Sequence, residues 1–334
     1  MAPLKLAIVG CGAIADYLHL PTAALTDEVE VCAAVDIDRA RANALAAKYS
    51  LRVASRLHEV AEHVDAAIIA VPPHLKVPIV SEALDLGLHA LCEKPLANTV
   101  SECEEMGRRA AAAGRVLGVV HQFRFWPSRQ WIQRRLGSGE LPPPLRVEVN
   151  QGGPYSWQSQ TGYTVRQDLV AGGVLINAGT HPLDTLISWF GDPMDLEYHD
   201  DALGGLESNV RMRMGFERVE GVFRLSRTCR LANEMRLVYD DRQLIVNNSD
   251  PFRVMERRPG VADREVVVTQ PPAIGYLAPA REVYRNFAAA VVGAAELAVD
   301  AAEGTRVIRL VERCYAMKRA RPVPVEAPLP GLTW

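Results

Sequence analysis

The sequence has no long apolar run. A membrane-spanning helix needs about 18 consecutive apolar residues, and no stretch of this chain approaches that length. The apolar segment nearest the start, residues 6–9, is as short as a β-strand and is unlike a signal peptide. We therefore expect a cytoplasmic protein that makes no membrane contact.

An excess of either charge is also missing. The chain has 37 Lys and Arg residues against 40 Asp and Glu residues, which gives a formal net charge of −3. These charges are scattered through both halves and form no basic stripe of the kind that neutralises nucleic-acid phosphates. The expected partner is a small molecule, and no nucleic acid is expected.

Cysteine pairs with the spacing of metal ligands are absent as well. The six cysteines lie far apart in the sequence and form no C-x-x-C motif. We expect them to be reduced and packed as small apolar residues. Because His58 and His63 are irregularly placed for a zinc site, no metal is expected.

The chain has the composition of a globular protein, with 49% hydrophobic and 23% charged residues. A length of 334 residues favours two domains. The first third alternates short apolar runs with Ala-rich stretches, which is typical of a parallel sheet covered by helices. The expected strands are residues 6–9, 31–35, 66–71, 90–92 and 116–120. The expected helices are residues 40–48, 78–86 and 101–113.

After about residue 123 the pattern changes to strands without regular intervening helices, which predicts a mainly antiparallel sheet. The expected strands are residues 145–151, 209–216, 219–226, 234–239, 243–246 and 265–269. Apolar residues alternate from Val219 to Leu225, so this strand should bury one face and turn the other outward, toward a ligand or a partner subunit. Helices are expected at residues 181–190, 280–291 and 303–318.

The first expected strand leads into a glycine motif. Residues 6–15 are L-A-I-V-G-C-G-A-I-A, a strand followed by G-x-G-x-x-A at the start of a helix. Gly10 permits a tight turn, Gly12 lets the backbone approach a pyrophosphate, and Ala15 keeps helix and strand close. The helix N-terminus adds N–H groups and a partial positive charge. Dinucleotide contacts are therefore assigned to Gly10, Gly12, Ala13 and Ile14.

An acidic residue follows where a dinucleotide site needs one. Asp36 ends the second expected strand, about 20 residues beyond the glycine motif, where a carboxylate accepts hydrogen bonds from the ribose 2'-hydroxyl. Such a carboxylate repels a 2'-phosphate, so NAD is favoured over NADP. Arg39 and Arg41 are close in sequence and leave NADP open. The alternative interpretation of Asp36 is a strand-end or helix-capping aspartate.

Further motifs stand in order along the chain. They are A-V-P-P-H at residues 70–74, C-E-K-P-L-A at residues 92–97, G-G-V-L-I-N-A-G-T-H-P-L-D at residues 172–184 and V-D-A-A-E-G at residues 299–304. Over nearly the whole chain they resemble the glucose-fructose oxidoreductase, inositol dehydrogenase and rhizopine-catabolism (Gfo/Idh/MocA) family.

This resemblance implies an α/β protein of two domains. A Rossmann domain, residues 1–122, would be followed by a substrate-binding and oligomerisation domain, residues 123–334, with an open, mainly antiparallel sheet. Members of the family often pack the sheets of two subunits together, so a homodimer or homotetramer is expected.

The resemblance also implies the activity. An NAD(P)-dependent oxidoreductase of this kind would move a hydride between nicotinamide and a secondary alcohol or ketone of a sugar, nucleotide sugar or cyclitol. The residues implied to contact the cofactor are Val71, Pro72, His74, Glu93 and Lys94.

Two residues are candidates for acid–base chemistry. Hydride transfer from a carbinol carbon requires a group that exchanges the hydroxyl proton and a donor that stabilises charge on oxygen. In the family, the lysine matching Lys94 contacts the reacting oxygen and the nicotinamide ribose, and the histidine matching His181 is the usual acid or base. Without the motif, Lys94 would be a surface charge and His181 a structural histidine at a helix start.

Asn177 departs from the family pattern, where aspartate is most frequent. It lies four residues before His181 and seven before Asp184, so a helical segment would direct the three side chains toward a common side. An amide can orient a substrate hydroxyl, but it cannot stabilise an imidazolium by charge. The proton relay would then differ from the commonest one.

Substrate contacts are expected from joining and loop segments that line the cleft in the family. Aromatic faces and polar forks suit the apolar faces and hydroxyls of sugars, although packing is the alternative for each residue. The candidates are Arg124, Tyr155, Trp157, Tyr163, Asn177 and His181.

Two other functions stay open at this point. One is a redox-assisted lyase or glycosidase, or a ketoreductase, with tightly bound NAD. The other is a non-catalytic NAD-binding regulator, and the presence of both Lys94 and His181 weighs against it.

Overall fold

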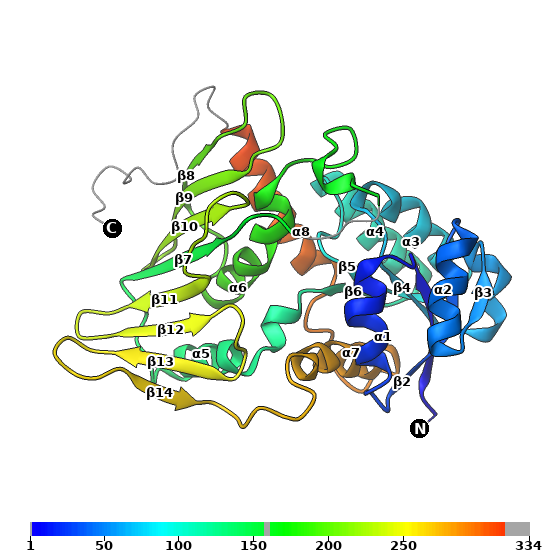
Figure 1. Cartoon of the computed structure of the whole chain (residues 1–334), viewed down its shortest axis with the longest axis horizontal. Coiled ribbons are helices and arrows are strands. Elements are labelled where there is room, and N and C mark those ends of the chain that lie inside the picture. Colours follow the sequence, from blue (N-terminus) through cyan, green and yellow to red (C-terminus); the bar gives the residue numbers. More distant parts are fainter. Residues whose placement is uncertain (1, 157–160, 318–334) are drawn as a thin grey trace. The chain divides into compact units, whose positions relative to one another are not determined.

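The computed structural model describes residues 2–156 and 161–317, which form two compact units (Figure 1). The first unit contains the chain up to Gln122. Two later segments also belong to it, one ending at Val170 and one spanning Ile274–Arg309. The second unit contains residues from Phe123, the stretch Ala171–Ala273 and residues 310–317. The units are therefore not two consecutive stretches of sequence.

The first unit is built on a parallel sheet of six strands. The strands are β1 (Leu4–Val9), β2 (Val29–Val35), β3 (Arg52–Ala54), β4 (Ala66–Ile69), β5 (His89–Glu93) and β6 (Leu117–Val120). Their order is β3-β2-β1-β4-β5-β6, and every pair is parallel. This order is that of a Rossmann fold, in which ligands bind outside the carboxyl ends of the strands where the winding reverses, here between β1 and β4.

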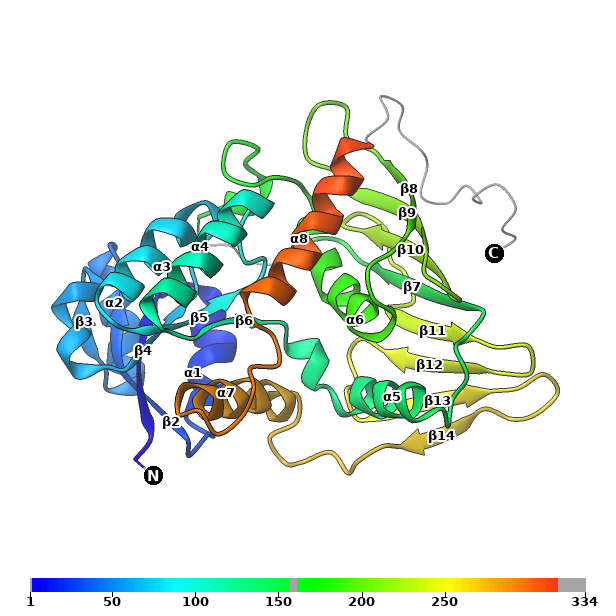
Figure 2. The same cartoon turned by 180° about the vertical axis from the view of Figure 1, so that it is seen from behind.

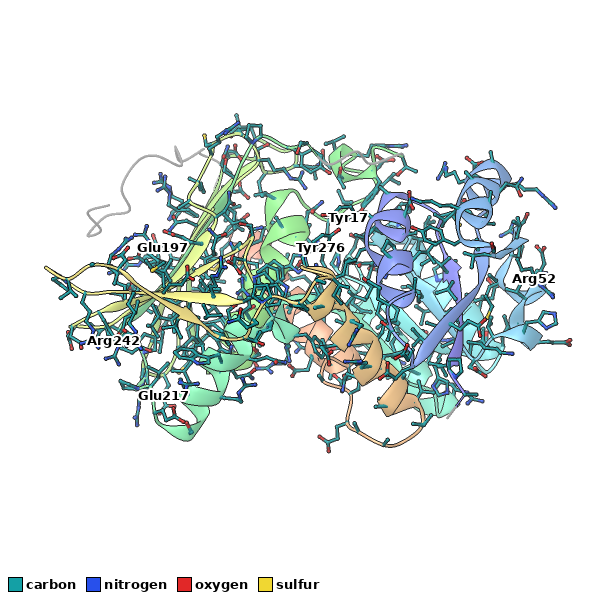
Figure 3. The ribbon with its side chains drawn as sticks, turned by 60° about the horizontal axis from the view of Figure 1, so that its bottom comes forward. Tyr17, Arg52, Glu197, Glu217, Arg242 and Tyr276 are labelled. Atoms are coloured by element: carbon teal, nitrogen blue, oxygen red, sulfur yellow. The ribbon has the colours of Figure 1, made fainter. Side chains whose placement is uncertain are left out.

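Helices pack against this sheet and bury it. They are α1 (Leu20–Ala23), preceded by a π-turn at Ala15–His19, α2 (Arg39–Tyr49), α3 (Lys76–Asp85), α4 (Val100–Ala113) and, from much later in the sequence, α7 (Leu277–Val291). Helix α1 contacts α7, and α3 lies beside α4 (Figure 2). Near the α1–α7 contact, the exposed rings of Tyr17 and Tyr276 stack with their centroids 5.7 Å apart (Figure 3). Short 3-10 turns lie at Leu57–Glu59, Ala61–His63, Pro73–Leu75, Gln122–Phe125 and Tyr163–Val165.

The second unit contains an open sheet of eight strands. The strands are β7 (Arg146–Gly152), β8 (Asp195–Asp200), β9 (Asn209–Gly215), β10 (Glu220–Ser226), β11 (Glu234–Val238), β12 (Gln243–Asn247), β13 (Arg253–Arg257) and β14 (Arg264–Val267). Their order is β14-β13-β12-β11-β7-β10-β9-β8. All neighbours are antiparallel except β7 and β10, which run parallel. The predicted mainly antiparallel sheet is confirmed.

One face of this second sheet carries the apolar core. Side chains such as Val149, Met212 and Phe223 on neighbouring strands are fully buried. Helices α5 (Pro127–Ser138) and α6 (Thr180–Phe190) belong to this unit, and a π-turn at Leu175–Gly179 precedes α6. Helix α8 (Ala301–Ala316) is shared, because residues 301–309 group with the first unit and residues 310–316 with the second. Within the described ranges, no helix is long and apolar enough to cross a membrane.

The structure corrects several local predictions. Strands β3, β8 and β13 and helix α5 were not predicted from the sequence. Val219, just before β10, and Phe223 and Leu225 on β10 are buried as predicted, but Val222 on the opposite face is buried as well. The outward face of this strand is therefore not uniformly open, because long side chains of the neighbouring strands, such as Arg213, flank Val222.

Candidate active site

The glycine loop after β1 has the shape that a pyrophosphate requires. Gly10 has a φ of 96°, and a Cβ there would lie 2.7 Å from the carbonyl oxygen of Ala70, so only glycine fits. A Cβ on Gly12 would meet no atom within 4 Å, which leaves open space beside the backbone. The chain turns helical at residue 13, and the helix N-terminus attracts an anion. The residues present therefore fit a dinucleotide.

Asp36 connects the end of β2 to the glycine loop. Its Oδ2 accepts a hydrogen bond from the N–H of Cys11 at 2.9 Å, and its Oδ1 accepts one from the N–H of Asp38 at 2.8 Å. These bonds fix the carboxylate beside the loop. Arg41 is held by the side chain of Asp38, with its Nε 2.9 Å from Oδ2, while Arg39 is exposed. Of these two arginines, Arg41 therefore pairs with Asp38, the aspartate that caps helix α2.

The segment after β4 enters the same edge of the sheet. Val71 and Pro72 follow the last residues of β4, and Pro73–Leu75 forms a 3-10 turn that continues into α3. His74 lies in that turn and is partly buried. Because β4 is the strand next to β1, these residues adjoin the glycine loop, and a Cβ on Gly10 would lie 2.9 Å from Cγ1 of Val71.

The E-K-P turn after β5 is held from inside the protein. The carboxylate of Glu93 is buried, with Oε1 3.2 Å from Nε2 of His19 and Oε2 accepting the N–H of Lys94 at 3.0 Å. Burial alone would raise the pKa of Glu93, but His19, Lys94 and Lys76 outweigh it and hold that pKa below its usual value. Lys94 itself is half-buried.

His181 lies in the first turn of α6, in the second unit, and packs face to face on Phe123, with the ring centroids 4.5 Å apart. Phe123 also contacts Trp126 and lies under the guanidinium of Arg129 at 4.6 Å. Burial lowers the pKa of Arg129 to about 9, so it remains charged at neutral pH. The imidazole of His181 is thus supported by an aromatic ring that a buried cation also contacts.

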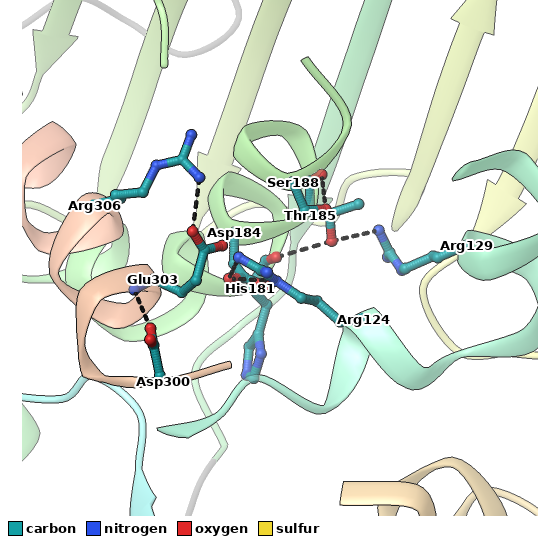
Figure 4. A network of polar contacts seen from close by, with 9 residues as sticks. All are labelled: Arg124, Arg129, His181, Asp184, Thr185, Ser188, Asp300, Glu303 and Arg306. Atoms are coloured by element: carbon teal, nitrogen blue, oxygen red, sulfur yellow. Dashed lines mark hydrogen bonds and ion pairs between the residues drawn. The ribbon is translucent and has the colours of Figure 1, made fainter. Parts of the chain in front are cut away.

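Arg124 binds a buried aspartate on the same helix as His181. Its Nε and one terminal nitrogen contact both carboxylate oxygens of Asp184 at 2.8 to 3.0 Å, and the Asp184 side chain is fully buried (Figure 4). A bidentate pair of this kind fixes orientation as well as charge. Figure 4 also shows Arg129 donating a hydrogen bond to the hydroxyl of Thr185, the residue after Asp184 on α6.

The G-G-x-L segment before α6 is held by a buried glutamate. Oε2 of Glu207 accepts the N–H of Gly173 at 2.7 Å, and Oε1 accepts the N–H of Leu175 and the hydroxyl of Tyr315 at 3.0 and 2.9 Å. Asn177 lies in the π-turn that follows and is partly exposed. The segment from Asn177 to Asp184 is helical. The prediction that the side chains of Asn177, His181 and Asp184 point toward one side requires such a helix.

The remaining candidates lie in loops. Tyr155 is 39% exposed, and the guanidinium of Arg227 lies 4.9 Å from its ring centroid. Tyr163 begins a 3-10 turn in the segment that belongs to the first unit. Trp157 lies outside the described residues. Substrate contact by Arg124, Tyr155 and Tyr163 stays a prediction.

Several polar residues of the site were missed in the sequence. Lys76, His19 and Tyr284 contact one another or the E-K-P turn, and Glu207 and Arg129 support the segment around His181. Each is buried, and none belongs to a motif that a single sequence displays. For Lys76 the sequence contained one indication of burial, because this lysine interrupts an otherwise apolar helical face. Among the residues that the structure describes, no three His, Cys, Asp or Glu side chains are grouped to hold a metal ion.

The parallel sheet with its glycine loop and Asp36 defines a dinucleotide-binding protein. Residues 4–121 match the model of the Gfo/Idh/MocA oxidoreductase family, described as having an NAD-binding Rossmann fold. Over these residues, which include the parallel sheet, the chain is similar to this family.

Known proteins with detectable similarity include sugar and cyclitol enzymes. The D-glucoside 3-dehydrogenase of Escherichia coli (strain K12) is 29% identical over 198 residues, which cover 58% of this chain and 55% of that enzyme. This chain therefore spans about half the length of that relative. The scyllo-inositol 2-dehydrogenase (NADP(+)) of Bacillus subtilis (strain 168) is 26% identical over 281 residues, covering 82% of this chain and 85% of that enzyme.

Solved structures share the fold over almost the whole chain. An aldose-aldose oxidoreductase from Caulobacter crescentus superposes with a TM-score of 0.83 at 20% identity, covering 94% of this chain and 97% of that chain. An inositol dehydrogenase homologue from Azotobacter vinelandii, complexed with NAD+, gives 0.82 at 22% identity, with coverages of 94% and 95%. At this identity the likeness shows the fold alone.

Proposed function

We propose that this protein is an NAD(P)-dependent dehydrogenase or reductase that acts on a CH–OH group of a sugar, nucleotide sugar or cyclitol. The observation that carries the proposal is the glycine loop, open at Gly12 and fixed to Asp36, in a chain whose relatives include a glucoside and an inositol dehydrogenase. Bound NAD would accept or supply the hydride.

Lys94 is proposed to hold the reacting oxygen. An ammonium donor there stabilises the charge that develops on oxygen as the C–H bond breaks or forms. The E-K-P turn follows β5 at the carboxyl edge of the sheet, the edge that also carries the glycine loop and Asp36. The half-buried side chain keeps Lys94 accessible while its main chain is fixed by Glu93.

His181 is proposed to exchange the hydroxyl proton, and Asn177 to orient the substrate hydroxyl beside it. The stacking of His181 on Phe123 restricts the imidazole to one plane, which favours a defined direction of proton transfer. The native amide at residue 177 adds no negative charge. The pair Arg124–Asp184 fixes the helix that carries His181.

NAD is proposed as the preferred cofactor, with NADP possible. The Asp36 carboxylate would repel a 2'-phosphate, and Arg41 is paired with Asp38. The carboxylate of Asp36 and the pairing of Arg41 with Asp38 therefore both favour NAD over NADP.

We further propose a homo-oligomer that pairs through the outward face of the second sheet. Arg146 pairs with Glu148 and Arg213 with Glu220 on this face, and Val222 between them is buried. Alternating charges are self-complementary across a two-fold axis. Sedimentation velocity should show a dimer or tetramer that Glu148→Arg weakens; a parent protein that sediments as a monomer would contradict this assembly.

The activity is tested with a panel of free sugars, nucleotide sugars and cyclitols, each with NAD and NADP, monitoring reduced nicotinamide by absorbance. On the best substrate, Lys94→Met should lower kcat by about 10² to 10⁴ while NAD binding stays within a few-fold. Lys48→Met is the matched control, because Lys48 is an exposed lysine paired with Asp16 on the same unit.

Product formation without net reduction of NAD would replace the proposal with a redox-assisted lyase or glycosidase. Normal turnover by Lys94→Met would refute the role of that lysine.

A further inference from the structure

Lys76 is a buried lysine that the proposed chemistry does not use. It is the first residue of α3, and only 1% of its surface is exposed. Burial lowers its pKa from 10.5 to about 8. At neutral pH it therefore carries a positive charge inside the first unit.

The contacts of Lys76 are made to the E-K-P turn. Its ammonium donates hydrogen bonds to the carbonyl oxygens of Glu93 and Pro95. These are the residues immediately before and after Lys94. One side chain thus holds the main chain on both sides of the lysine that is proposed to contact the reacting oxygen.

This position is an unfavourable one for a cation. Removing an ammonium from water is costly unless its surroundings compensate, and the N-terminus of a helix disfavours positive charge. Lys94 adds repulsion, since its charge lowers the pKa of Lys76 further. A methionine of similar length would avoid all three penalties, so stability alone does not account for Lys76.

A second buried group holds the same turn from its other side. The carboxylate of Glu93 accepts the N–H of Lys94 and contacts His19, whose Nδ1 lies 2.7 Å from the hydroxyl of Tyr284 on α7. Glu93 and Lys76 carry opposite charges within this space. The turn is therefore fixed by a pair of buried ions.

We propose that Lys76 is a positioning residue for Lys94: its ammonium fixes the carbonyl groups on either side of Lys94. The inference rests on the proposed role of Lys94. It adds that the place of the Lys94 amine depends on a residue 18 positions earlier in the sequence.

The test measures Lys94 directly, without substrate. The full-length parent and Lys76→Met are labelled with trace acetic anhydride across a pH range, and the modification of the Lys94 peptide is followed by mass spectrometry. In Lys76→Met the labelling rate of Lys94 should rise a few-fold at each pH, because the turn that carries Lys94 loses two hydrogen bonds and opens more readily. Lys5→Met, which replaces an exposed lysine of the same unit, should leave that rate unchanged.

Turnover supplies the second measurement. Misplacement of Lys94 should reduce kcat of Lys76→Met on the order of 10- to 100-fold, with the Kd for NAD within about twofold as evidence of a folded Rossmann unit. Lys76→Gln keeps an N–H donor, so it should recover part of kcat and part of the slow parental labelling of Lys94. This variant also serves if Lys76→Met does not fold.

A parental labelling rate of Lys94 in folded Lys76→Met would overturn the inference, and so would parental kcat in that variant. If the parent oxidises no substrate of the panel, the proposed function fails while the labelling result still decides the relation between Lys76 and Lys94.

Discussion

Glu207 offers the sharpest test of how the second unit holds its candidate active-site helix. Its carboxylate accepts three hydrogen bonds, from the N–H groups of Gly173 and Leu175 and from the hydroxyl of Tyr315, and the residue is 1% exposed. In Glu207→Gln one oxygen becomes an NH2 group. At best the amide oxygen still accepts from Leu175 and Tyr315, and the NH2 group then faces the N–H of Gly173.

The expected cost follows from these contacts. A hydrogen bond to a charged group contributes roughly 1.5 to 3 kcal/mol, and a buried N–H left without an acceptor costs about as much as the lost bond. Loss of the negative charge near a helix N-terminus adds roughly 0.5 to 1 kcal/mol. We expect Glu207→Gln to lower the free energy of unfolding of the second unit by about 3 kcal/mol.

Tryptophan fluorescence can follow this unit selectively, because all five tryptophans come after residue 122 in the sequence. Urea unfolding of the parent and Glu207→Gln gives the difference. Glu140→Gln is the control: its carboxylate is exposed and pairs with the partly exposed Arg135, so loss of that pair should cost at most about 1 kcal/mol. If the two variants unfold at the same urea concentration, the carboxylate of Glu207 does not hold the segment as argued.

Three other outcomes are expected. Asp36→Ala should weaken NAD more than NADP in titrations of both cofactors, and an unaltered preference would remove Asp36 from the ribose site. Asn177→Asp should move the basic-form limb of the pH–rate profile to higher pH, because a carboxylate favours a charged imidazole, and His181→Ala should abolish that limb; superimposable profiles of parent and Asn177→Asp would separate the two residues. The parent should gain roughly 3 kcal/mol of unfolding free energy between pH 8 and 10.5 relative to Lys76→Met, because Lys76 takes up a proton on unfolding while its folded pKa is about 8. Parallel stability curves would show that Lys76 titrates normally.

The sequence by itself determined the parallel α/β character of the first 120 residues and the place of the dinucleotide loop. Both are local properties: strands buried on both faces are continuous apolar runs, and a turn with the φ of Gly10 requires glycine. The E-K-P and G-G-x-L segments were found in the same way, as short contiguous motifs. Their contacts with cofactor and substrate stay predictions.

Elements with weak local patterns appeared only in the structure. Strand β8 is D-L-E-Y-H-D and β13 is R-V-M-E-R, and both are polar because they lie at or near an edge of the second sheet. Their strand conformation comes from pairing with neighbours, which no window of the sequence contains. The sequence pattern of helix α5 is also weak, because only Ser128, Arg129 and Ile132 of its residues are buried.

The supports of the candidate site were decided by tertiary structure alone. Lys76 and Glu93 are 17 residues apart, Glu207 and Gly173 are 34 apart, and His19 reaches Tyr284 across 265 residues. Sequence patterns report which residues share a face of one element, whereas the partner of a buried charge is set by which elements the fold brings together. A buried cation or carboxylate is stable only where those partners meet it, so its role became visible only in the folded chain.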